Sequence, residues 1–270
     1  GEGVDGVTPQ ATRGLFGGGG GYTDTIQYIT IATTGNAIDF GNLTDGSYSL
    51  GGCSDGTRGV FAIGTPASLQ ISNIIDYVTI ATLGNATDFG DSTQARYSVG
   101  ACANDVRGLF AGGYVNTGWT NANVIDYITI ATTGNATDFG DLTVGRYGAT
   151  AGVASATRGI FAGGFNSNII EYVTIATTGN ATDFGDLTAT RNQGAGVASL
   201  TRGVFGGGSY TNVMDYITIA TTGNATDFGD LNSATELLAG LDNDTRGVFG
   251  GEVNTDRIDY ITIDTTGNAT

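Results

Sequence analysis

The stretch that decides the fold is Ile-Asp-Tyr-Ile-Thr-Ile-Ala-Thr-Thr-Gly-Asn-Ala-Thr-Asp-Phe-Gly-Asp-Leu-Thr, residues 125–143. Its first half is rich in β-branched and aromatic residues and predicts a strand over residues 125–132. Gly134 and Asn135 tolerate the positive φ angles that a tight hairpin turn requires. Residues 137–142 then predict a strand that returns antiparallel to the first. The stretch is therefore expected to form a β-hairpin.

This hairpin belongs to a unit that occurs six times in 270 residues, at spacings of 44 to 51 residues. Each unit begins with an Arg-Gly-apolar-Phe strand, and a Gly/Ala-rich return such as residues 147–154 predicts the first strand of the next unit. Repeats of this length are typical of propeller blades. We therefore predict one all-β domain over residues 1–270, a six-bladed β-propeller of four-stranded antiparallel blades. The units are marked by Arg13, Arg58, Arg107, Arg158, Arg202 and Arg246.

The two ends of the chain affect how the ring closes. The sixth unit stops at Thr270, directly after its Gly-Asn turn, so the last blade is expected to lack its outer strand. Residues 1–12 are expected to supply the inner strand of the first blade. The unpaired edge of the last blade is compatible with a three-stranded blade, with a chain that continues, or with another subunit that covers it. The start at Gly1 without Met is typical of a processed or partial product.

The composition disfavours several classes of function. The ten basic residues are all Arg, and 26 acidic residues give a formal net charge of −16. A chain without His has no imidazole base and no His ligand for a metal, and no cofactor is predicted. Phosphate backbones would be repelled, so no nucleic-acid partner is expected. The sequence contains no run of about 18 apolar residues, so no membrane insertion is expected.

Length variation between units is confined to one loop. The distance from the repeated Tyr to the next repeated Arg is 30 or 31 residues, whereas the distance from each Arg to its own Tyr varies from 14 to 20. The loop between strands two and three therefore varies on a constant frame, and such loops often carry binding. Its longest versions are residues 64–73 and 112–123. Strand alternation places this loop on the same face as the connection from strand four to the next blade.

Aromatic residues on this loop face form the candidate ligand-binding site. Exposed rings stack on sugars or anchor protein partners. The alternative is that these rings fold over the blades and cover their edges. Trp119, the only Trp, lies in the longest loop. The candidates are Tyr22, Tyr97, Tyr114, Trp119, Tyr147, Phe165 and Tyr210.

Other repeated residues are expected to be structural. The six Arg are expected to anchor each blade to backbone or to a nearby Asp, rather than to form an anion-binding ring. Acid pairs such as Asp138/Asp141 indicate turns or edges rather than calcium ligands, and no metal site is predicted. Asn-Ala-Thr sequons such as that of Asn135 indicate turns rather than glycosylation. Cys53 and Cys102 occupy a position that carries Val or Leu in later units, which favours apolar packing over a disulfide.

The unit resembles a kelch-type repeat. Glycine doublets such as Gly112-Gly113 close the second strand, and Arg96, Arg146 and Arg191 follow the fourth strand, although Phe stands where kelch repeats usually have Trp. The resemblance implies that partners bind the face carrying the variable loops. The near-identical units Asp-Tyr-Ile-Thr-Ile-Ala-Thr-Thr-Gly-Asn-Ala-Thr-Asp-Phe-Gly-Asp are also similar to repeats in virion structural proteins of marine tailed phages. That similarity implies a capsid or tail appendage.

These features favour a non-enzymatic structural or adhesive binding module on a virion or extracellular surface. Its expected partners are a glycan or protein receptor and other virion or surface proteins. The alternative is a kelch-like protein-interaction scaffold in a cell. Catalysis is disfavoured because a propeller sialidase would need an Arg triad and a Tyr-Glu pair, and Glu171 is the single mid-chain Glu candidate. A glycoside hydrolase that uses an Asp pair is a remote alternative.

Overall fold

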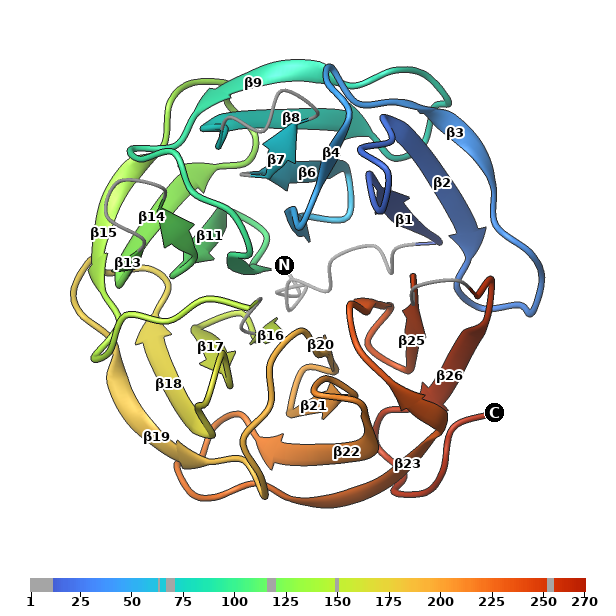
Figure 1. Ribbon diagram of the computed structural model, residues 1–270, viewed down its shortest axis with the longest axis vertical. Helices are drawn as coiled ribbons and strands as arrows, with labels where there is room; N and C mark the ends of the chain where they lie inside the picture. The colour runs from blue at the N-terminus through green and yellow to red at the C-terminus, as the bar shows by residue number, and fades with distance from the viewer. Residues whose placement is uncertain (1–11, 63, 67–70, 116–119, 149–150, 252–254) are drawn as a thin grey trace, which may run out of the picture.

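A computed structural model describes residues 12–62, 64–66, 71–115, 120–148, 151–251 and 255–270. In these residues six antiparallel sheets are arranged around a common centre, with no helix among them (Figure 1). The prediction of an all-β, six-bladed propeller is confirmed. Figure 1 places β3, β9, β15, β19 and β23 at the rim, and β16 and β20 near the centre.

Four blades have four strands each, ordered from the inside outwards. Blade two contains β5 (Gly51–Ser54), β6 (Arg58–Ala62), β8 (Ile74–Thr79) and β9 (Thr87–Asp91). Blade three contains β10 (Gly100–Ala103), β11 (Arg107–Ala111), β14 (Val124–Thr129) and β15 (Thr137–Asp141). Blade four contains β16 (Ala151–Ala154), β17 (Arg158–Ala162), β18 (Ile169–Thr174) and β19 (Thr182–Asp186). Blade five contains β20 (Ala195–Ala198), β21 (Arg202–Gly206), β22 (Thr211–Thr218) and β23 (Thr226–Thr235).

The first and last blades have three described strands each. Blade one contains β1 (Arg13–Gly17), β2 (Thr25–Thr30) and β3 (Ile38–Asn42), and blade six contains β24 (Ala239–Asp242), β25 (Arg246–Gly250) and β26 (Ile258–Thr262). The expected lack of an outer strand in blade six is confirmed for the described residues. The inner strand expected from residues 1–12 falls outside the described residues, except for residue 12. Four short strands lie in the loops: β4 (Ser47–Tyr48), β7 (Thr65–Pro66), β12 (Tyr114–Val115) and β13 (Thr120–Asn121).

In blades two to five the third strand has buried residues on both faces. In β14 the neighbours Ile125 and Asp126 are both buried, and so are Ile128 and, just beyond the strand, Ile130. A bulge between Ile125 and Asp126 shifts the register against β15. Packing on both faces explains why the apolar residues of this stretch do not alternate with polar ones, because neighbouring blades cover both sides of the sheet.

Each repeated Arg links its own blade to the next one. The guanidinium carbon of Arg158 lies 4.6 Å from the centre of the Tyr172 ring in the same blade, and Nη1 donates to the carbonyl oxygen of Ile219 in blade five at 3.0 Å. The same two contacts occur at all six arginines. Arg246 donates to the carbonyl oxygen of Ile31, which joins blade six to blade one. The partners are backbone carbonyls rather than Asp side chains.

The glycine after each repeated Arg receives a side chain from the preceding blade. A Cβ added to Gly108 would lie 2.8 Å from Cys53 Sγ, and a Cβ added to Gly14 would lie 2.4 Å from a methyl carbon of Leu241. At five of the six glycines an inner-strand Cys, Val or Leu fills this space, and at Gly59 it is Leu15 of β1. Cys53 and Cys102 are both free, as apolar packing predicts, and burial raises the pKa of Cys102 to about 12. The glycine therefore sets how closely two blades approach.

A second link between blades lies at the rim. The N–H groups of Gly134 and Ala136 donate to the carbonyl oxygens of Phe89 and Asp91, each at 2.8 Å, and Asn135 Oδ1 accepts the N–H of Asp91 at 3.1 Å. The prediction that Gly134 and Asn135 both supply positive φ angles to a tight hairpin turn is therefore wrong in part. Of the two, only Gly134 has a positive φ (154°), and the Asn135 carboxamide binds the preceding blade. We call this set of three bonds the rim clasp.

Replacing Arg158 by Ala is expected to lower the free energy of unfolding by about 2 kcal/mol, because the cation–π contact and the bond to Ile219 are both lost. Urea denaturation followed by circular dichroism measures the change. Arg158→Lys keeps the positive charge but loses the planar fork, and is expected to fall between the two proteins. Equal stability of all three proteins would contradict a role for Arg158 in blade contact.

Candidate functional site

The connection from each outer strand to the next inner strand contains a sharp turn. Ser49, Ser98, Gln193 and Leu237 have φ between 56° and 60°, a conformation that side chains rarely adopt. Gly148 has φ 92° at the same place in the repeat. The residue before each turn residue is therefore held at an equivalent place in every repeat. In three repeats that preceding residue is Tyr.

The connections and the variable loops meet on one face. Strand β4 pairs with β7, and Tyr97 and Tyr114 exchange backbone hydrogen bonds of 3.2 and 2.8 Å. Each pairing joins a strand-four connection to a strand two-to-three loop, as strand alternation predicts. We call the surface formed by these segments the loop face.

An unbroken row of aromatic rings crosses the loop face. Tyr97 and Tyr114 have ring centres 5.5 Å apart, Tyr114 and Tyr147 are 5.0 Å apart, and Tyr147 stacks on Phe165 at 5.1 Å with 22° between the planes. The row continues from Tyr97 through Tyr48 to Tyr22, at 6.4 and 5.1 Å. It runs from blade one to blade four. We call it the aromatic strip: Tyr22, Tyr48, Tyr97, Tyr114, Tyr147 and Phe165.

The structure brings together five of the seven aromatic residues predicted from sequence. They are Tyr22, Tyr97, Tyr114, Tyr147 and Phe165. Tyr210 is 73% exposed and contacts no other ring among the described residues, and Trp119 lies outside those residues. Tyr48 is the member that sequence reasoning missed. Its position in the repeat, directly before the turn, is the same as that of Tyr97 and Tyr147, and this alignment could have identified it.

The strip combines apolar ring faces with phenol groups. Burial raises the pKa of Tyr97, and the neighbouring phenols of Tyr48, Tyr114 and Tyr147 raise it further. Its hydroxyl group therefore remains protonated well above neutral pH and can donate or accept hydrogen bonds. Phe165, at the end of the strip, is 47% exposed. The strip can therefore pack against a flat apolar surface and bond polar groups at its margin.

Buried ion pairs anchor the connections beneath the strip. Arg96, directly before Tyr97, donates to Asp126 at 2.8 Å, and both side chains are inaccessible to solvent. Arg146, directly before Tyr147, bonds Glu171 in the same way. Since an Arg-carboxylate pair is directional, each pair fixes the course of the connection that carries the ring. Glu171, the mid-chain Glu considered for catalysis, is therefore held in a buried ion pair.

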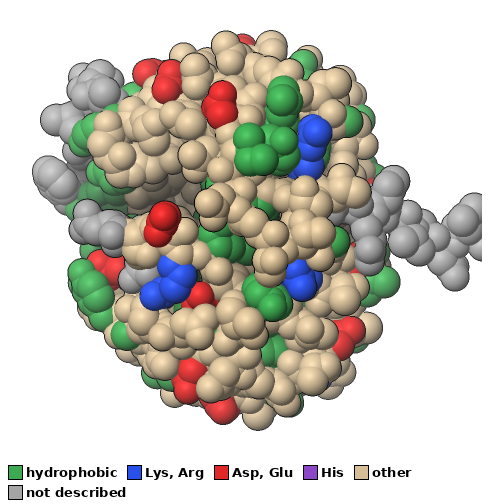
Figure 2. All heavy atoms as spheres, turned by 90° about the vertical axis from the view of Figure 1, so that its right-hand side faces the viewer, with side chains coloured by type: hydrophobic (Ala, Val, Ile, Leu, Met, Phe, Trp, Pro, Cys, Tyr) green, Lys and Arg blue, Asp and Glu red, His purple; other side chains and the backbone are tan. Residues whose placement is uncertain are grey.

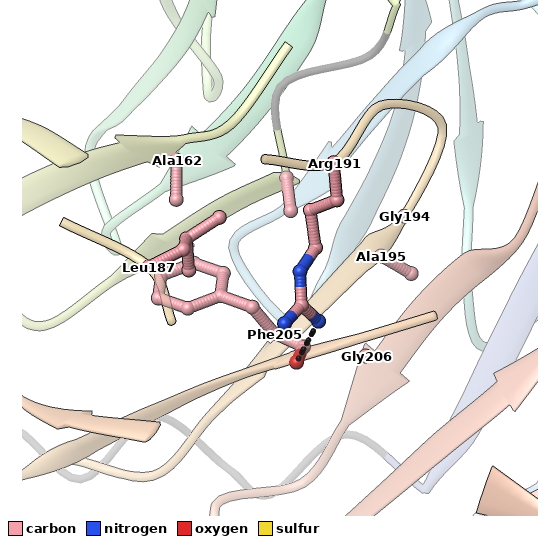
Figure 3. A pocket seen from close by; sticks show the side chains of 8 residues that line it. Ala162, Leu187, Arg191, Gly194, Ala195, Phe205 and Gly206 are labelled. Atoms are coloured by element: carbon pink, nitrogen blue, oxygen red, sulfur yellow. Dashed lines mark hydrogen bonds between the residues drawn. The ribbon is translucent and has the colours of Figure 1, made fainter. Parts of the chain in front are cut away.

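The third ion pair joins Arg191 to Asp215. Arg191 donates to Asp215 at 2.5 Å and to the carbonyl oxygen of Phe205 at 3.4 Å, beside a small cavity between blades four and five (Figure 3). Burial lowers the pKa of Arg191, and the charge of Asp215 opposes that shift. Thr188 also donates to Asp215 at 2.7 Å. The carboxylate thus joins two segments of the connection to the blade.

The first repeat lacks this Arg. Ser47 stands at its position, and the buried Asp76 keeps only the hydrogen bonds from the N–H and hydroxyl of Thr44, at 2.8 to 2.9 Å, among the described residues. Burial is the main reason why the pKa of Asp76 is raised. Ser47 and Asp76 line a small cavity, and the hydroxyl groups of Ser47 and Thr65 are buried without a partner in the described part of the chain. Asp76 is therefore a buried carboxylate that the described residues leave without a charged partner.

In the part of the chain that the structure describes, no three His, Cys, Asp or Glu residues gather closely enough to hold a metal ion. The described part of the chain also contains no helix with the length and hydropathy needed to cross a bilayer. No model of a known protein family matches the chain, and a search of curated proteins finds no match to it. The inference of function therefore depends on the geometry of the loop face.

Asp76→Asn and Asp215→Asn are expected to change stability in opposite directions at neutral pH. Asp76→Asn removes an uncompensated buried charge and raises the free energy of unfolding by about 1 kcal/mol. Asp215→Asn leaves Arg191 without its charge partner and lowers it by about 3 kcal/mol. Because the pKa of Asp76 is raised in the folded state, protonated Asp76 contributes favourably to the free energy of unfolding at low pH. That contribution is lost as the pH rises. The advantage of Asp76→Asn is therefore expected to grow from about pH 4 to neutrality. Thermal denaturation at several pH values measures both effects, and changes of the same sign would contradict the assignment.

Spectrophotometric titration of tyrosinate should show a late class that includes Tyr97, because burial and three neighbouring phenols disfavour its ionised form. Tyr97→Phe is expected to remove one tyrosine from that class. Tyr210, whose pKa is raised chiefly by a hydrogen bond with Glu236, provides the comparison. Tyr210→Phe should remove a different late tyrosine and leave that of Tyr97. Far-ultraviolet circular dichroism over the same pH range checks that the protein remains folded.

Proposed function

We propose that the protein is a non-enzymatic binding module that holds a glycan or protein receptor on the aromatic strip. The observation that carries this proposal is the unbroken row of six rings over four blades. A row of rings on separate, rigid blades offers an extended recognition surface at little cost in conformational entropy. The buried Arg-carboxylate pairs support it, because they hold the connections in place before a ligand arrives.

A neutral glycan is the receptor that the strip suits best. Sugar rings present flat C–H faces that pack on aromatic planes and hydroxyl groups that bond to phenols. The net charge of −16 disfavours acidic sugars at this surface. The exposed ring of Phe165 also suits an apolar protein contact. A protein-interaction scaffold in a cell is therefore the second candidate.

The proposed setting is a virion or extracellular surface, where the propeller would be a capsid or tail appendage beside other virion or surface proteins. This setting is inferred from the similarity of the Asp-Phe-Gly-Asp repeats to those of phage virion structural proteins. A ring of repeated blades is a rigid support for a receptor-binding face.

The proposal does not include catalysis. General acid–base catalysis by a carboxyl group requires that group to lie within reach of the substrate. Asp126, Glu171 and Asp215, which stand at the same repeat position, are buried and paired with Arg. These carboxylates therefore support a structural role, which leaves the aromatic rings as the groups that contact the ligand.

Glycan-array binding by the purified protein, followed by titration with the best glycan, tests the proposal. Tyr114→Ala and Tyr147→Ala are each expected to weaken binding about tenfold or more, because stacking of one aromatic ring contributes roughly 1–2 kcal/mol. Leu83→Ala is the matched control, because Leu83 is 58% exposed in the rim turn of blade two, away from the strip. Thermal denaturation of each variant checks the fold.

Three outcomes would overturn the glycan proposal. Binding that is unchanged in both Tyr variants would exclude the strip as the site. Absence of glycan binding, together with purification of one stoichiometric protein partner that Tyr147→Ala releases, would favour the scaffold. Cleavage of a bound glycan by the purified protein would favour a hydrolase.

A further inference from the structure

Five carboxylates occupy the same position in their repeats, and four of them are paired with an Arg. The Arg before the turn of the connection supplies three of these pairs, Arg96 with Asp126, Arg146 with Glu171 and Arg191 with Asp215. In the last repeat Arg257, from the variable loop, pairs with Asp259 at 3.3 Å. Among the described residues, Asp76 is bonded only by the N–H and hydroxyl of Thr44. Asp76 therefore lacks the positive partner that its counterparts have.

The basic side chains of the chain are all engaged elsewhere. The ten basic residues are Arg, and all ten lie among the residues that the structure describes. Six stack on the repeated Tyr rings, and the other four bond the carboxylates named above. Burial raises the pKa of Asp76 most, and the negative charges of Asp88 and Asp45 raise it further. The side chains of these 270 residues therefore leave the charge of Asp76 without a counter-charge.

A cavity between the first connection and blade two leads to this carboxylate. The exposed residues Asp45 and Ile74 line it together with the buried residues Ser47 and Asp76, so it reaches from the surface to the carboxylate. Ser47 is only 6% exposed, and its hydroxyl has no hydrogen-bond partner in the described part of the chain. The cavity offers about 20 Å³ to the centres of water-sized groups, and one such group needs roughly 10–15 Å³. We call this cavity the Asp76 pocket.

The other repeats show what the acceptors of the Asp76 pocket bind. In blade three the guanidinium of Arg96 donates to Asp126 at 2.8 Å and to the carbonyl oxygen of Phe110 at 3.1 Å. The corresponding residues of blade two are Asp76 and Phe61, and both line the pocket. The residue in the place of the Arg is a Ser, whose hydroxyl is a further acceptor. The pocket therefore keeps the acceptors of a cation site, but its own side chain is too short to supply the cation.

We propose that the Asp76 pocket binds a primary ammonium group. An ammonium head is compact, carries one positive charge and has three N–H donors. Three acceptors match them: the carboxylate of Asp76, the hydroxyl oxygen of Ser47 and the carbonyl oxygen of Phe61. A free guanidinium, with four heavy atoms, exceeds a space for one or two water-sized groups. The rest of the amine would leave the pocket past the exposed residues Asp45 and Ile74.

The charge of the molecule favours a cationic ligand. The formal net charge is −16, and acidic side chains are spread over the side of the molecule that Figure 2 shows. Asp45 adds an exposed carboxylate to the lining of the pocket. A negative surface raises the local concentration of cations and the rate at which they arrive. An amine is therefore attracted to the molecule before it reaches Asp76.

A bound ammonium group would act on the connection that carries Tyr48. Ser47 directly precedes Tyr48 in β4, as Arg96 precedes Tyr97 in the next repeat. An ammonium group bonded to both Ser47 and Asp76 would join the first connection to blade two, as the buried ion pairs join the later connections. This binding needs no receptor on the aromatic strip, so the two can be measured separately.

The test titrates the full chain with methylammonium chloride at neutral pH. Tetramethylammonium chloride keeps the ionic strength constant, because this cation has the same charge but no N–H donor. We expect the melting temperature to rise by about 2 °C or more at about 100 mM methylammonium. Backbone amide signals in nuclear magnetic resonance are expected to shift saturably at residues 44–47 and at Asp76. Potassium chloride, whose cation also lacks N–H donors, is expected to give a weaker response.

A lysine derivative distinguishes two sources of the ammonium group. N-acetyl-lysine amide carries the group on a longer stem. Affinity equal to that of methylammonium would indicate an amine presented by a larger molecule, such as a Lys side chain of a partner. Binding of methylammonium alone would indicate a free small amine. Both results support the Asp76 pocket as an ammonium site.

Three variants locate the response. Asp76→Asn is expected to abolish it, so the stability advantage of this variant at neutral pH should shrink as methylammonium is added. Asp138→Asn removes one negative charge from an exposed position of β15 and is expected to keep the full response. Ser47→Arg introduces the Arg found in three other repeats and is expected to raise the melting temperature and abolish the response. The absence of any response to methylammonium, an equal response to potassium, or a response retained by Asp76→Asn would each overturn the proposal.

Discussion

The Arg-Gly pair at the start of each second strand is the contact on which the ring depends. The Arg spans from the Tyr of its own blade to a carbonyl oxygen of the next, and the adjacent Gly accepts an inner side chain from the preceding blade. Together these contacts fix the spacing of two blades midway along the blades and near the central axis of the ring. Because the same pair is repeated six times, a constant step closes on itself, and Arg246 meets Ile31. The pair also accounts for part of the composition. A planar guanidinium can stack on a ring and donate sideways at once, whereas an ammonium group cannot.

The scaffold is nearly symmetric, but the loop face is not. The turn with positive φ recurs in every connection, yet the residue before it is Tyr in the first three connections and Asn192 or Glu236 in the last two. The aromatic strip therefore ends at blade four, because its position in the last two connections is held by a polar residue. The variable loops add Tyr22, Tyr114 and Phe165 to the strip, whereas Tyr210, in the loop of blade five, has no ring contact among the described residues. Repetition thus provides rigidity, and substitution at one repeated position provides a directional surface.

The sequence predicted the fold well because one strong pattern is repeated. The Arg-Gly strand and the Ile-Asp-Tyr-Ile-Thr-Ile strand identify the blade, and among the described residues blade six has the three strands predicted from the spacing of Thr270 and Arg246. The same pattern could not reveal contacts between blades. The pattern assigns Asn135 to its own turn, but its carboxamide bonds a neighbouring blade. Ser47 stands where the next three repeats have Arg, and Gln27 stands where the other repeats have Asp or Glu. Only the packing of adjacent blades shows which contacts these two substitutions remove.

Among the described residues, the boundary between blades six and one keeps only part of the contacts found at the other five boundaries. It keeps the Arg246 bond and the packing of Leu241 on Gly14, but among the described residues it lacks the rim clasp and the buried outer-strand Phe found elsewhere. The aromatic strip begins in blade one, directly beside the boundary, so its first ring depends on how that blade is held.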